Sequence, residues 1–543
     1  MVSVNTCSTM THDDAPLVRP GQRIECNGYY GTIGYIGEVP PTKGIWLGID
    51  WDDPARGKHN GTHEGEKYFN TRHPTSGSFV RLEKVNLGKS CPAAIRNRYG
   101  EVKDDETAGI NKENLALLQR EINARFLEVV GFDKVNKKQS QFEELLVVCL
   151  REYYVNGPGK PGELLKLCPN LKELDLSRNL IQNWHSVADI ACQLRHLRVL
   201  NISENQLDIP LQATELQGSF QALEHLIMAG MDYSWSQILN CAVMWPDIYI
   251  LQVPFNKITT LETPPSGILQ HLKSLDLEGN EINDWREINK LGTIPCLEYL
   301  NVSNVGVSEV FFPVCQPELK TRLFPALKQI HLSQNNIHNW ESMNELNKLL
   351  QLEELRFRDN PLLQQESIET SRQFVIARIG NLKNLNGAII TNDERKGAEI
   401  DYLKKYGVVW VNMAKPLDIM NHKPILDMFV QSHPRYPLLV DKYGAPDEGE
   451  YKTRKVTLNT NLITVEIFSP DQDCKTYRKK LPLSMQVQKL MGLVQRLFNT
   501  GSEMPRLAYI SSKNPDIEFP LDKSQKELSF YSIEDGDRIS VRW

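Results

Sequence analysis

Leucine and asparagine positions recur with a fixed spacing through the middle of the chain. Between about residues 140 and 386 the pattern L-x-x-L-x-L-x-x-N returns, mostly at intervals of 24 to 26 residues. Copies start at Leu171, Leu197, Leu272, Leu327 and Leu352, and weaker ones lie near Leu146 and at Leu223, Ile248 and Leu297. This period is typical of a leucine-rich repeat, which has one short strand and one return segment per unit. We therefore expect an α/β solenoid over residues 140–386.

The repeat also predicts how its units pack. Its leucines should point inward and stack on those of the next unit, each contributing roughly 1.5–3 kcal/mol. The asparagine should turn inward as well, because its amide can satisfy backbone groups where the strand ends. These asparagines are Asn179, Asn205, Asn256, Asn280, Asn335 and Asn360. A tryptophan follows the asparagine by five residues at Trp184, Trp285 and Trp340, and packing on the convex side explains this offset better than a binding site does.

The outward positions of the repeat strands form two files on the expected concave face. The first file is Asp175, Asn201, Ile227, Gln252, Asp276, Asn301, His331 and Arg356. The second is Ser177, Ser203, Ala229, Pro254, Glu278, Ser303, Ser333 and Arg358. The middle of the array is acidic and its C-terminal end is basic. We expect Arg356 and Arg358 to contact an acidic partner surface, although a solvated repeat face explains them equally well.

The segments on either side of the repeats have other compositions. Residues 20–86 are rich in glycine and aromatic residues and alternate short β-type runs with turns, which predicts a small, strongly curved β domain. Residues 87–139 are predicted to be a linker with a helical lead-in. Residues 387–450 should form a charged, helical cap and connector. Residues 451–543 follow the order strand, strand, helix, strand, strand, which suits an α+β roll.

Overall composition limits the classes of function. A length of 543 residues suggests about three domains. The net charge of −6 provides no basic field for nucleic acid, and no apolar run is long enough for a membrane span. The start has no signal-peptide layout, and the ten cysteines include no C-x-x-C pair, which predicts reduced thiols in a cytosolic protein. No nucleophile–base motif is present, so we expect neither an enzyme nor a cofactor.

The most specific short motif is the pentapeptide Gly57-Lys58-His59-Asn60-Gly61. Two glycines four residues apart indicate a loop with positive φ angles, and the side chains between them can bind an anion. His59 and His63 are also four residues apart, but no third ligand lies nearby, so a zinc site is disfavoured. With the preceding "GIWLGI" and the following "GEKYF" and "SFVRLEKV", this stretch resembles the CAP-Gly domain, whose hallmark loop is Gly-Lys-Asn-Asp-Gly. His59-Asn60 departs from that loop.

The CAP-Gly resemblance implies binding of acidic C-terminal tails that end in an aromatic residue, such as the tail of α-tubulin. Lys58 would supply a cation for a carboxylate, and the loop amides could form a carboxylate nest. Trp46 and Phe79 would form the floor of an aromatic pocket. The tail-binding residues predicted in this way are Trp46, Gly57, Lys58, His59, Asn60, Gly61, Phe79 and Arg81.

The last segment, with "LSFYSIEDGDRISVRW", resembles a ubiquitin-like domain that stops at Trp543 without a Gly-Gly tail. The expected fold class is therefore multidomain, with a small all-β CAP-Gly barrel, an α/β leucine-rich-repeat solenoid and an α+β ubiquitin-like roll. This order of domains resembles the tubulin-folding cofactor E family.

The family resemblance implies a chaperone that binds α-tubulin. It would act with tubulin cofactors B, C and D and a small GTPase to assemble and dissociate the αβ-tubulin heterodimer. The implied location is the cytoplasm, in association with the cytoskeleton, and the ubiquitin-like domain would dock a second cofactor or the proteasome and ubiquitin machinery. The alternative is a microtubule-end scaffold or ubiquitin-pathway adaptor without chaperone activity.

Overall fold

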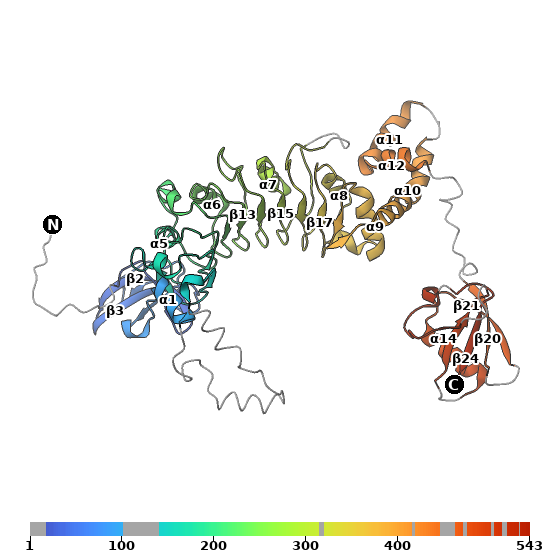
Figure 1. Ribbon diagram of the computed structural model, residues 1–543, viewed down its shortest axis with the longest axis horizontal. Coiled ribbons are helices and arrows are strands. Elements are labelled where there is room, and N and C mark those ends of the chain that lie inside the picture. Colours follow the sequence, from blue (N-terminus) through green and yellow to red (C-terminus); the bar gives the residue numbers. More distant parts are fainter. Residues whose placement is uncertain are drawn as a thin grey trace, which may run out of the picture. The chain divides into compact units, whose positions relative to one another are not determined.

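The computed structural model divides into two compact units, residues 1–445 and 446–543. It describes residues 18–100, 141–313, 320–414, 419–445, 462–470, 475–500, 504–512, 518–531 and 533–543. The first unit holds a small β domain, the repeat array and a helical cap, and the second holds a separate α+β fold (Figure 1). Within the described residues, no helix has both the length and the apolar character needed to cross a bilayer.

The β domain is a four-stranded antiparallel sheet with strand order β1-β2-β3-β6. Its strands are β1 (Arg23–Cys26), β2 (Tyr29–Val39), β3 (Thr42–Trp51) and β6 (Gly77–Val80), and a small hairpin joins β4 (Thr62–His63) to β5 (Glu66–Lys67). The short 3-10 helix η1 (Leu82–Lys84) follows β6. The buried core of the β domain is formed by Ile24, Ile33, Leu47, Ile49 and Trp51. The pairing of β2 with β3 slips by a residue between Ile33 and Tyr35, which is the irregularity of a β-bulge and bends the sheet.

The array is one eleven-stranded sheet that runs in order from β8 to β19. The strands are β8 (Val147–Cys149), β10 (Glu173–Asp175), β11 (Val199–Asn201), β12 (His225–Ile227), β13 (Ile250–Gln252), β14 (Ser274–Asp276), β15 (Tyr299–Asn301), β16 (Gln329–His331), β17 (Glu354–Arg356), β18 (Asn384–Leu385) and β19 (Ala388–Ile389). All neighbours are parallel except β18 and β19. The central strands lie side by side in Figure 1.

The return segments carry short helices and 3-10 turns. They are η3 (Phe142–Glu144), α4 (Glu163–Leu167), α5 (Trp184–Ala191), η4 (Ala213–Ser219), α6 (Trp235–Ala242), α7 (Trp285–Asn289), η5 (Lys290–Thr293), α8 (Glu341–Leu346), η6 (Pro361–Gln364) and α9 (Ile368–Arg378). Trp184 and Trp285 are almost fully buried and begin α5 and α7. Packing, rather than binding, is therefore confirmed for these two tryptophans. Trp340 is half-buried just before α8.

The repeat asparagines connect successive turns of the array, as predicted. All six are at most 3 % exposed, and the side-chain amide of each donates to a backbone carbonyl of the preceding repeat. Asn335, for example, donates from Nδ2 to the Val302 carbonyl at 2.8 Å, and its Oδ1 accepts the Val305 N–H at 3.1 Å. Each asparagine side chain thus supplies hydrogen bonds to backbone groups that have no strand partner beyond the end of the strand.

The segment after the β domain is part of the array and not a free linker. β7 (Lys89–Ser90) pairs in parallel with β9 (Val155–Gly157), and α1 (Cys91–Tyr99) buries Cys91, Ala94 and Ile95 in the core of the first repeats. Residues 87–139 were predicted to be a linker with a helical lead-in, and α1 is a helix, but residues 89–99 pack on the array rather than forming a free connection. Burial explains the difference, because the N-terminal end of a solenoid exposes leucines that need a cover. The remainder of that prediction, residues 101–139, lies outside the described residues.

Polar contacts fix the β domain against the first repeats. Arg23 is only 4 % exposed and donates to Asp52 at 2.7 Å within the β domain. From the array, the Gln206 side-chain carbonyl accepts hydrogen bonds from Arg72 at 2.6 Å and Arg23 at 3.4 Å. Burial raises the pKa of Asp52, but hydrogen bonds from Arg23 and Arg72 outweigh it and leave the pKa below its ordinary value. The carboxylate therefore stays charged at the junction.

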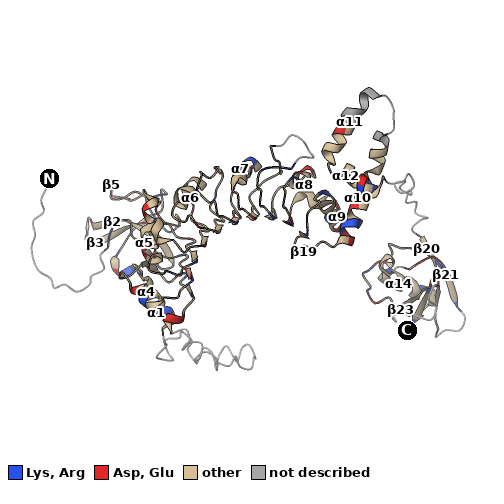
Figure 2. Cartoon of the chain, turned by 45° about the horizontal axis from the view of Figure 1, so that its top comes forward, with Lys and Arg blue, Asp and Glu red and all other residues tan. Residues whose placement is uncertain are grey.

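Three helices close the other end of the array: α10 (Asn392–Ala414), α11 (Ile419–Ser432) and α12 (Tyr436–Tyr443). Figure 2 shows charged residues of both signs along α9 and α10, two helices that pack against each other. The buried carboxylate of Glu399 accepts from Arg435 at 2.9 Å and from Lys442 and Tyr443 at 2.8 Å. A charged helical cap was predicted here, and this carboxylate joins α10 to α12.

The C-terminal unit is a five-stranded sheet with strand order β21-β20-β24-β22-β23 and one long helix. Its elements are β20 (Leu462–Phe468), β21 (Thr476–Pro482), α14 (Val487–Phe498), β22 (Arg506–Ile510), β23 (Glu518–Pro520), η7 (Leu528–Tyr531) and β24 (Arg538–Arg542). Val487, Leu490 and Val494 of α14 pack with Val465 and Ile539 in its core. The short strand β23 adds to the predicted order because it pairs antiparallel with β22.

Candidate peptide-binding site

The glycine-bounded loop is pinned to the neighbouring strand. The Lys58 N–H donates to the Gly77 carbonyl at 2.8 Å, and the Gly77 N–H returns a bond of 2.7 Å to the His59 carbonyl. Gly61 has φ +87°, as expected of the loop. Gly57 does not have a positive φ; it must be glycine because a Cβ there would lie 2.1 Å from the Thr75 carbonyl oxygen.

The backbone N–H groups of the loop already donate to acceptors within the β domain. Besides Lys58, the N–H of His59 donates to Gly77 at 3.2 Å, and the N–H of Gly61 donates to the His59 Nδ1 at 3.0 Å. A carboxylate nest of loop amides was expected, but these three donors already have acceptors within the domain. We therefore expect a bound tail to contact the side chains of the loop rather than these three amides.

The side chains of Lys58 and Asn60 extend into solvent. Both are exposed, and within the described residues neither side chain forms a hydrogen bond or ion pair. The Lys58 ammonium is therefore a mobile point charge with three donors, available to a carboxylate from outside the chain.

His59 is a neutral member of the site. Burial lowers the pKa of its imidazole, and the neighbouring His63 lowers it further. Because Nδ1 accepts the Gly61 N–H, the single proton of the neutral ring lies on Nε2. His59 thus offers one hydrogen-bond donor and no charge at neutral pH, and Lys58 remains the cation of the loop.

Phe79 is the centre of an aromatic cluster beside the loop. Five rings lie with their centroids 5.1 to 6.4 Å from that of Phe79: Tyr35, His59, His63, Tyr68 and Phe69. Most of these contacts are edge-to-face, the favoured arrangement of aromatic pairs. Phe79 remains half-buried. The cluster therefore provides a half-open apolar surface close to the cation.

Trp46 does not share this cluster. It is not one of the rings that contact Phe79; instead the Arg81 guanidinium lies over the indole, 3.8 Å from its centroid. The indole N–H donates to Thr42 Oγ1 at 2.8 Å, and Arg81 donates to the carbonyls of Ile45 and Lys43 at 3.0 and 2.7 Å. Trp46 thus stacks with Arg81 rather than on the Phe79 ring, and a pocket floor that both rings form for a tail stays a prediction.

The structure adds three residues that the sequence analysis did not single out, Tyr35, Tyr68 and Phe69. Phe69 is buried, and it packs so closely on Gly34 and Gly48 that a Cβ at either glycine would lie within 2.9 Å of its ring. The available signal in the sequence was the aromatic pair Tyr68-Phe69, which follows the loop in "GEKYF". The close packing of Phe69 thus explains why positions 34 and 48 are glycine.

The first outward file of the array is in the predicted register, whereas Ser177, Ser203 and Ser303 of the second file are buried. Asp175, Asn201, Ile227, Gln252, Asp276, Asn301, His331 and Arg356 are directly paired from strand to strand. The Arg356 side chain is 55 % exposed and lies 3.8 Å from the Glu354 carboxylate. Arg358 is also exposed, but it donates to the Asn386 carbonyl at 2.8 Å. Arg356 is therefore the more accessible of the two, and their contact with a partner stays a prediction.

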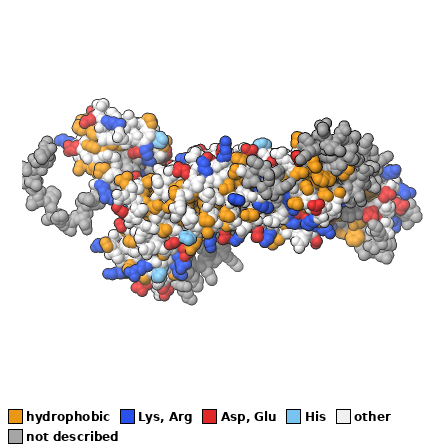
Figure 3. All heavy atoms as spheres, turned by 90° about the horizontal axis from the view of Figure 1, so that it is seen from above, with side chains coloured by type: hydrophobic (Ala, Val, Ile, Leu, Met, Phe, Trp, Pro, Cys, Tyr) orange, Lys and Arg blue, Asp and Glu red, His pale blue; other side chains and the backbone are white. Residues whose placement is uncertain are grey.

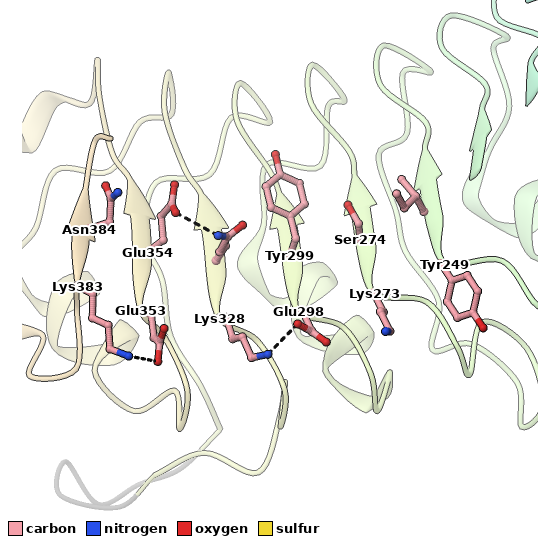
Figure 4. A pocket seen from close by; sticks show the side chains of 12 residues that line it. Tyr249, Lys273, Ser274, Glu298, Tyr299, Lys328, Glu353, Glu354, Lys383 and Asn384 are labelled. Atoms are coloured by element: carbon pink, nitrogen blue, oxygen red, sulfur yellow. Dashed lines mark hydrogen bonds and ion pairs between the residues drawn. The ribbon is translucent and has the colours of Figure 1, made fainter. Parts of the chain in front are cut away.

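A groove of about 550 Å³ lies where strands β13 to β18 begin. Figure 4 shows its rim, on which Lys328 pairs with Glu298 and Lys383 with Glu353. Neither Arg356 nor Arg358 lines this groove. Acidic and basic side chains are also interspersed over the array face seen in Figure 3. Three lysines and three glutamates line the groove, so it carries no net charge for an acidic ligand, unlike the loop with Lys58.

Comparison with known proteins places these observations in a family. Residues 20–85 match the family model of the CAP-Gly domain. The chain is 43% identical over 526 residues to tubulin-specific chaperone E of Bos taurus, covering 96% of this chain and 98% of the relative. It is 36% identical over 536 residues to the protein of the same name of Drosophila melanogaster, covering 98% of this chain and 99% of that one.

One solved structure similar to this chain is that of the C-terminal ubiquitin-like domain of mouse tubulin-specific chaperone E. It is 40% identical with a TM-score of 0.15, and the match covers 15% of this chain and 87% of that structure. The near-complete coverage of both whole-length relatives shows that the chain belongs to the tubulin-specific chaperone E family.

Proposed function

We propose that this protein is a tubulin-folding chaperone that holds the acidic, aromatic-ended C-terminal tail of α-tubulin in the site at Lys58 and Phe79. One observation carries the proposal: an exposed, unpaired ammonium group lies beside a half-open aromatic cluster on a loop that the fold pins in place. The names of the relatives, tubulin-specific chaperones, agree with it.

Each part of the tail has a matching part of the site. Lys58 pairs with a glutamate or with the terminal carboxylate through charge-assisted hydrogen bonds. The terminal aromatic ring packs on Phe79, and the His59 Nε2–H donates to a second oxygen. Two or three such bonds at about 1.5–3 kcal/mol each, reduced by the costs of association, correspond to micromolar affinity.

The array is proposed to bind the globular body of tubulin, with Arg356 and Arg358 as contacts for an acidic surface. We further propose that tubulin cofactors B, C and D and a small GTPase act with the protein on the αβ-tubulin heterodimer in the cytoplasm. In this scheme the protein binds and positions tubulin and carries out no catalytic step of its own.

The test of the tail site is a titration of the full chain with a labelled peptide that is acidic and ends in an aromatic residue, followed by fluorescence anisotropy. Lys58→Ala should weaken binding about tenfold or more, since one lost charged bond is worth about 1.5–3 kcal/mol. Lys84→Ala is the matched control, because Lys84 is an exposed lysine of the same domain outside the loop and the cluster. Equal affinities for the wild type and Lys58→Ala would refute the assignment of the loop.

A second measurement separates a chaperone from a microtubule-end scaffold. The protein is mixed with tubulin heterodimer, with and without the partner cofactors, and the products are sized by chromatography. A chaperone is expected to bind free α-tubulin and to split the heterodimer with those cofactors. A scaffold would leave the heterodimer intact and bind polymer through the tail.

A further inference from the structure

Four asparagine–glycine pairs occur in the sequence, at residues 27–28, 60–61, 156–157 and 386–387. Such a pair can rearrange chemically when the backbone nitrogen of the glycine attacks the side-chain carbonyl carbon of the asparagine. The reaction needs an asparagine side chain that is free to turn towards this nitrogen and a base that removes the amide proton. The surroundings of the four pairs therefore decide which of them can react.

Hydrogen bonds hold two of the four asparagine side chains in place. Asn156 donates from Nδ2 to a backbone carbonyl at 2.8 Å, and the Asn386 Oδ1 accepts a backbone N–H at 2.7 Å. Asn27 and Asn60 are exposed, and neither side chain makes a hydrogen bond with a described residue. The pairs at 27–28 and 60–61 are therefore the two whose side chains are free to react.

The glycine amides of these two pairs donate to different groups. The Gly28 N–H donates to a carboxylate oxygen of Glu25 at 2.6 Å. The Gly61 N–H donates to the His59 Nδ1 at 3.0 Å. Imidazole is the stronger base, because its ordinary pKa is about 6.5 against about 4.3 for a glutamate. The two glycines have nearly the same φ, +84° and +87°, so the acceptor rather than the conformation of the glycine distinguishes the pairs.

His59 is in the protonation state that a base requires. Burial lowers the pKa of its imidazole, and the neighbouring His63 of β4 lowers it further, so the ring is neutral at pH 7. Its ring contacts Phe69 and Phe79 carry no charge, and the Lys58 side chain beside it in the loop is exposed. Among the described residues, His63 is thus the titratable side chain that acts on His59, and a charge on His63 would favour the neutral form of His59.

We propose that Asn60 is a site of self-catalysed deamidation, with His59 as the general base. The His59 Nδ1 takes the proton of the Gly61 N–H while the Gly61 nitrogen bonds to Cγ of Asn60. The Cγ–Nδ2 bond then breaks, and the imidazolium returns the proton to the leaving nitrogen, which departs as ammonia. Water opens the resulting succinimide ring at either carbonyl and leaves aspartate or isoaspartate at position 60.

The isoaspartate product lengthens the loop backbone between two fixed points. On one side, the His59 N–H donates to the Gly77 carbonyl at 3.2 Å, and the Gly77 N–H donates to the His59 carbonyl at 2.7 Å. On the other side, the Gly61 carbonyl accepts the Tyr68 N–H at 2.9 Å. We expect the extra methylene to break one of these bonds and to weaken tail binding at Lys58. This consequence rests on the proposed tail site, whereas the reaction itself does not.

The experiment incubates the folded full chain at neutral pH in heavy-oxygen water and follows each asparagine–glycine pair by digestion and mass spectrometry. The heavy oxygen marks only the product that forms during the incubation. Asn60 should deamidate at least about tenfold faster than Asn27, a small share of the about 10²–10⁴-fold that a positioned general base contributes. In urea, where the fold no longer holds His59 against the Gly61 amide, this difference should disappear, and its persistence would show that the fold has no part in the reaction.

His59→Asn is the decisive variant, because its Oδ1 can accept the Gly61 N–H in place of Nδ1 but is not a base. Asparagine is also the residue of the CAP-Gly hallmark loop at this position, so the variant should fold. Deamidation of Asn60 should slow at least about tenfold, while Asn27, the internal control, should keep its rate. A hydrogen bond that only holds the loop predicts an unchanged rate at Asn60. That result, or a wild-type rate at Asn60 no faster than at Asn27, would overturn the proposal.

The pH dependence gives a second readout that does not need a variant. The rate at Asn60 should level off above about pH 6.5, because the His59 imidazole, whose pKa lies below 6.5, is then neutral. The rate at Asn27 should rise in proportion to hydroxide over the same range. A proportional rise at Asn60 as well would show that hydroxide, and not His59, removes the proton, and would also overturn the proposal.

Discussion

The asparagine ladder of the array allows a sharp test, because two neighbouring asparagines have opposite environments. Asn335 is 3 % exposed; its Nδ2 donates to Val302, and its Oδ1 accepts the N–H groups of Val305 and Gly306 at 3.1 and 3.0 Å. Asn336 is exposed and makes one side-chain hydrogen bond of 3.3 Å, to the Gly306 carbonyl. Substituting each by alanine therefore compares a buried asparagine with an exposed one at the same end of the same strand.

The magnitude follows from the groups that Asn335→Ala leaves without a partner. Val302 and Val305 are at most 1 % exposed, so water cannot replace the lost bonds to the Val302 carbonyl and the Val305 N–H. At about 1–3 kcal/mol for each buried orphan, the free energy of unfolding of the array should fall by about 2–6 kcal/mol. Asn336→Ala should change it by less than about 0.5 kcal/mol, as is usual for a surface substitution.

Urea unfolding followed by tryptophan fluorescence measures both variants, and hydrogen exchange localises the effect. In Asn335→Ala, amides of residues 302–337 should exchange faster, and the adjacent repeats should follow because each repeat is stabilised by its neighbours. Equal unfolding midpoints for the two variants would refute the reasoning that these asparagines hold the turns together.

Two further predictions concern the loop and the cap. Gly57→Ala should destabilise the β domain by about 1–3 kcal/mol, the cost of overpacking, and should weaken binding of the tail peptide, because the new Cβ meets the Thr75 carbonyl. Gly65→Ala is the comparison: its new Cβ has no atom within 4 Å, although φ there is positive, unlike at Gly57. It therefore reports backbone strain without steric overlap, and a larger effect at Gly65 in thermal unfolding would contradict the argument from overpacking. Burial raises the pKa of Glu399, but hydrogen bonds from Lys442, Arg435 and Tyr443 outweigh it and hold the pKa below its ordinary 4.5. The stability that this carboxylate gives the cap is therefore present above about pH 4.5 and is lost as the pH falls below it. Glu399→Gln should flatten the acid limb of a pH titration of stability followed by circular dichroism, and an unchanged acid limb would exclude this role.

The sequence predicted the array well because its information is periodic. A leucine or asparagine at a fixed offset has the same neighbours in every repeat, so positions such as Arg356 could be assigned to a file before any coordinates were known. The buried environment of Asn335 and Trp285 follows from the same periodicity. The prediction for each repeat position therefore rested on several copies of the repeat along the chain.

The site was predicted less completely because its contacts are irregular. The strand β2 slips in register at Tyr35, and Arg81 reaches back across the sheet to cover Trp46, so strand alternation alone could not tell which ring joins Phe79. The loop motif identified Lys58 but not the hydrogen bonds that use up the amides around it. Those bonds depend on Gly77, which follows the loop by sixteen residues and carries no motif of its own.

The junction between the β domain and the array gives the proposed tail site its significance. Micromolar binding of a flexible tail would add little to the affinity for tubulin if the β domain rotated freely against the array, because the tail would restrict the position of the tubulin body only loosely. Here Arg72 and the buried Arg23 both bond to Gln206 of the array, and α1 continues directly into the core of the first repeats. The loop thus belongs to the same compact unit as the array. If the array contacts the body as proposed, the second contact becomes intramolecular, and its gain depends on this fixed geometry rather than on the strength of either contact.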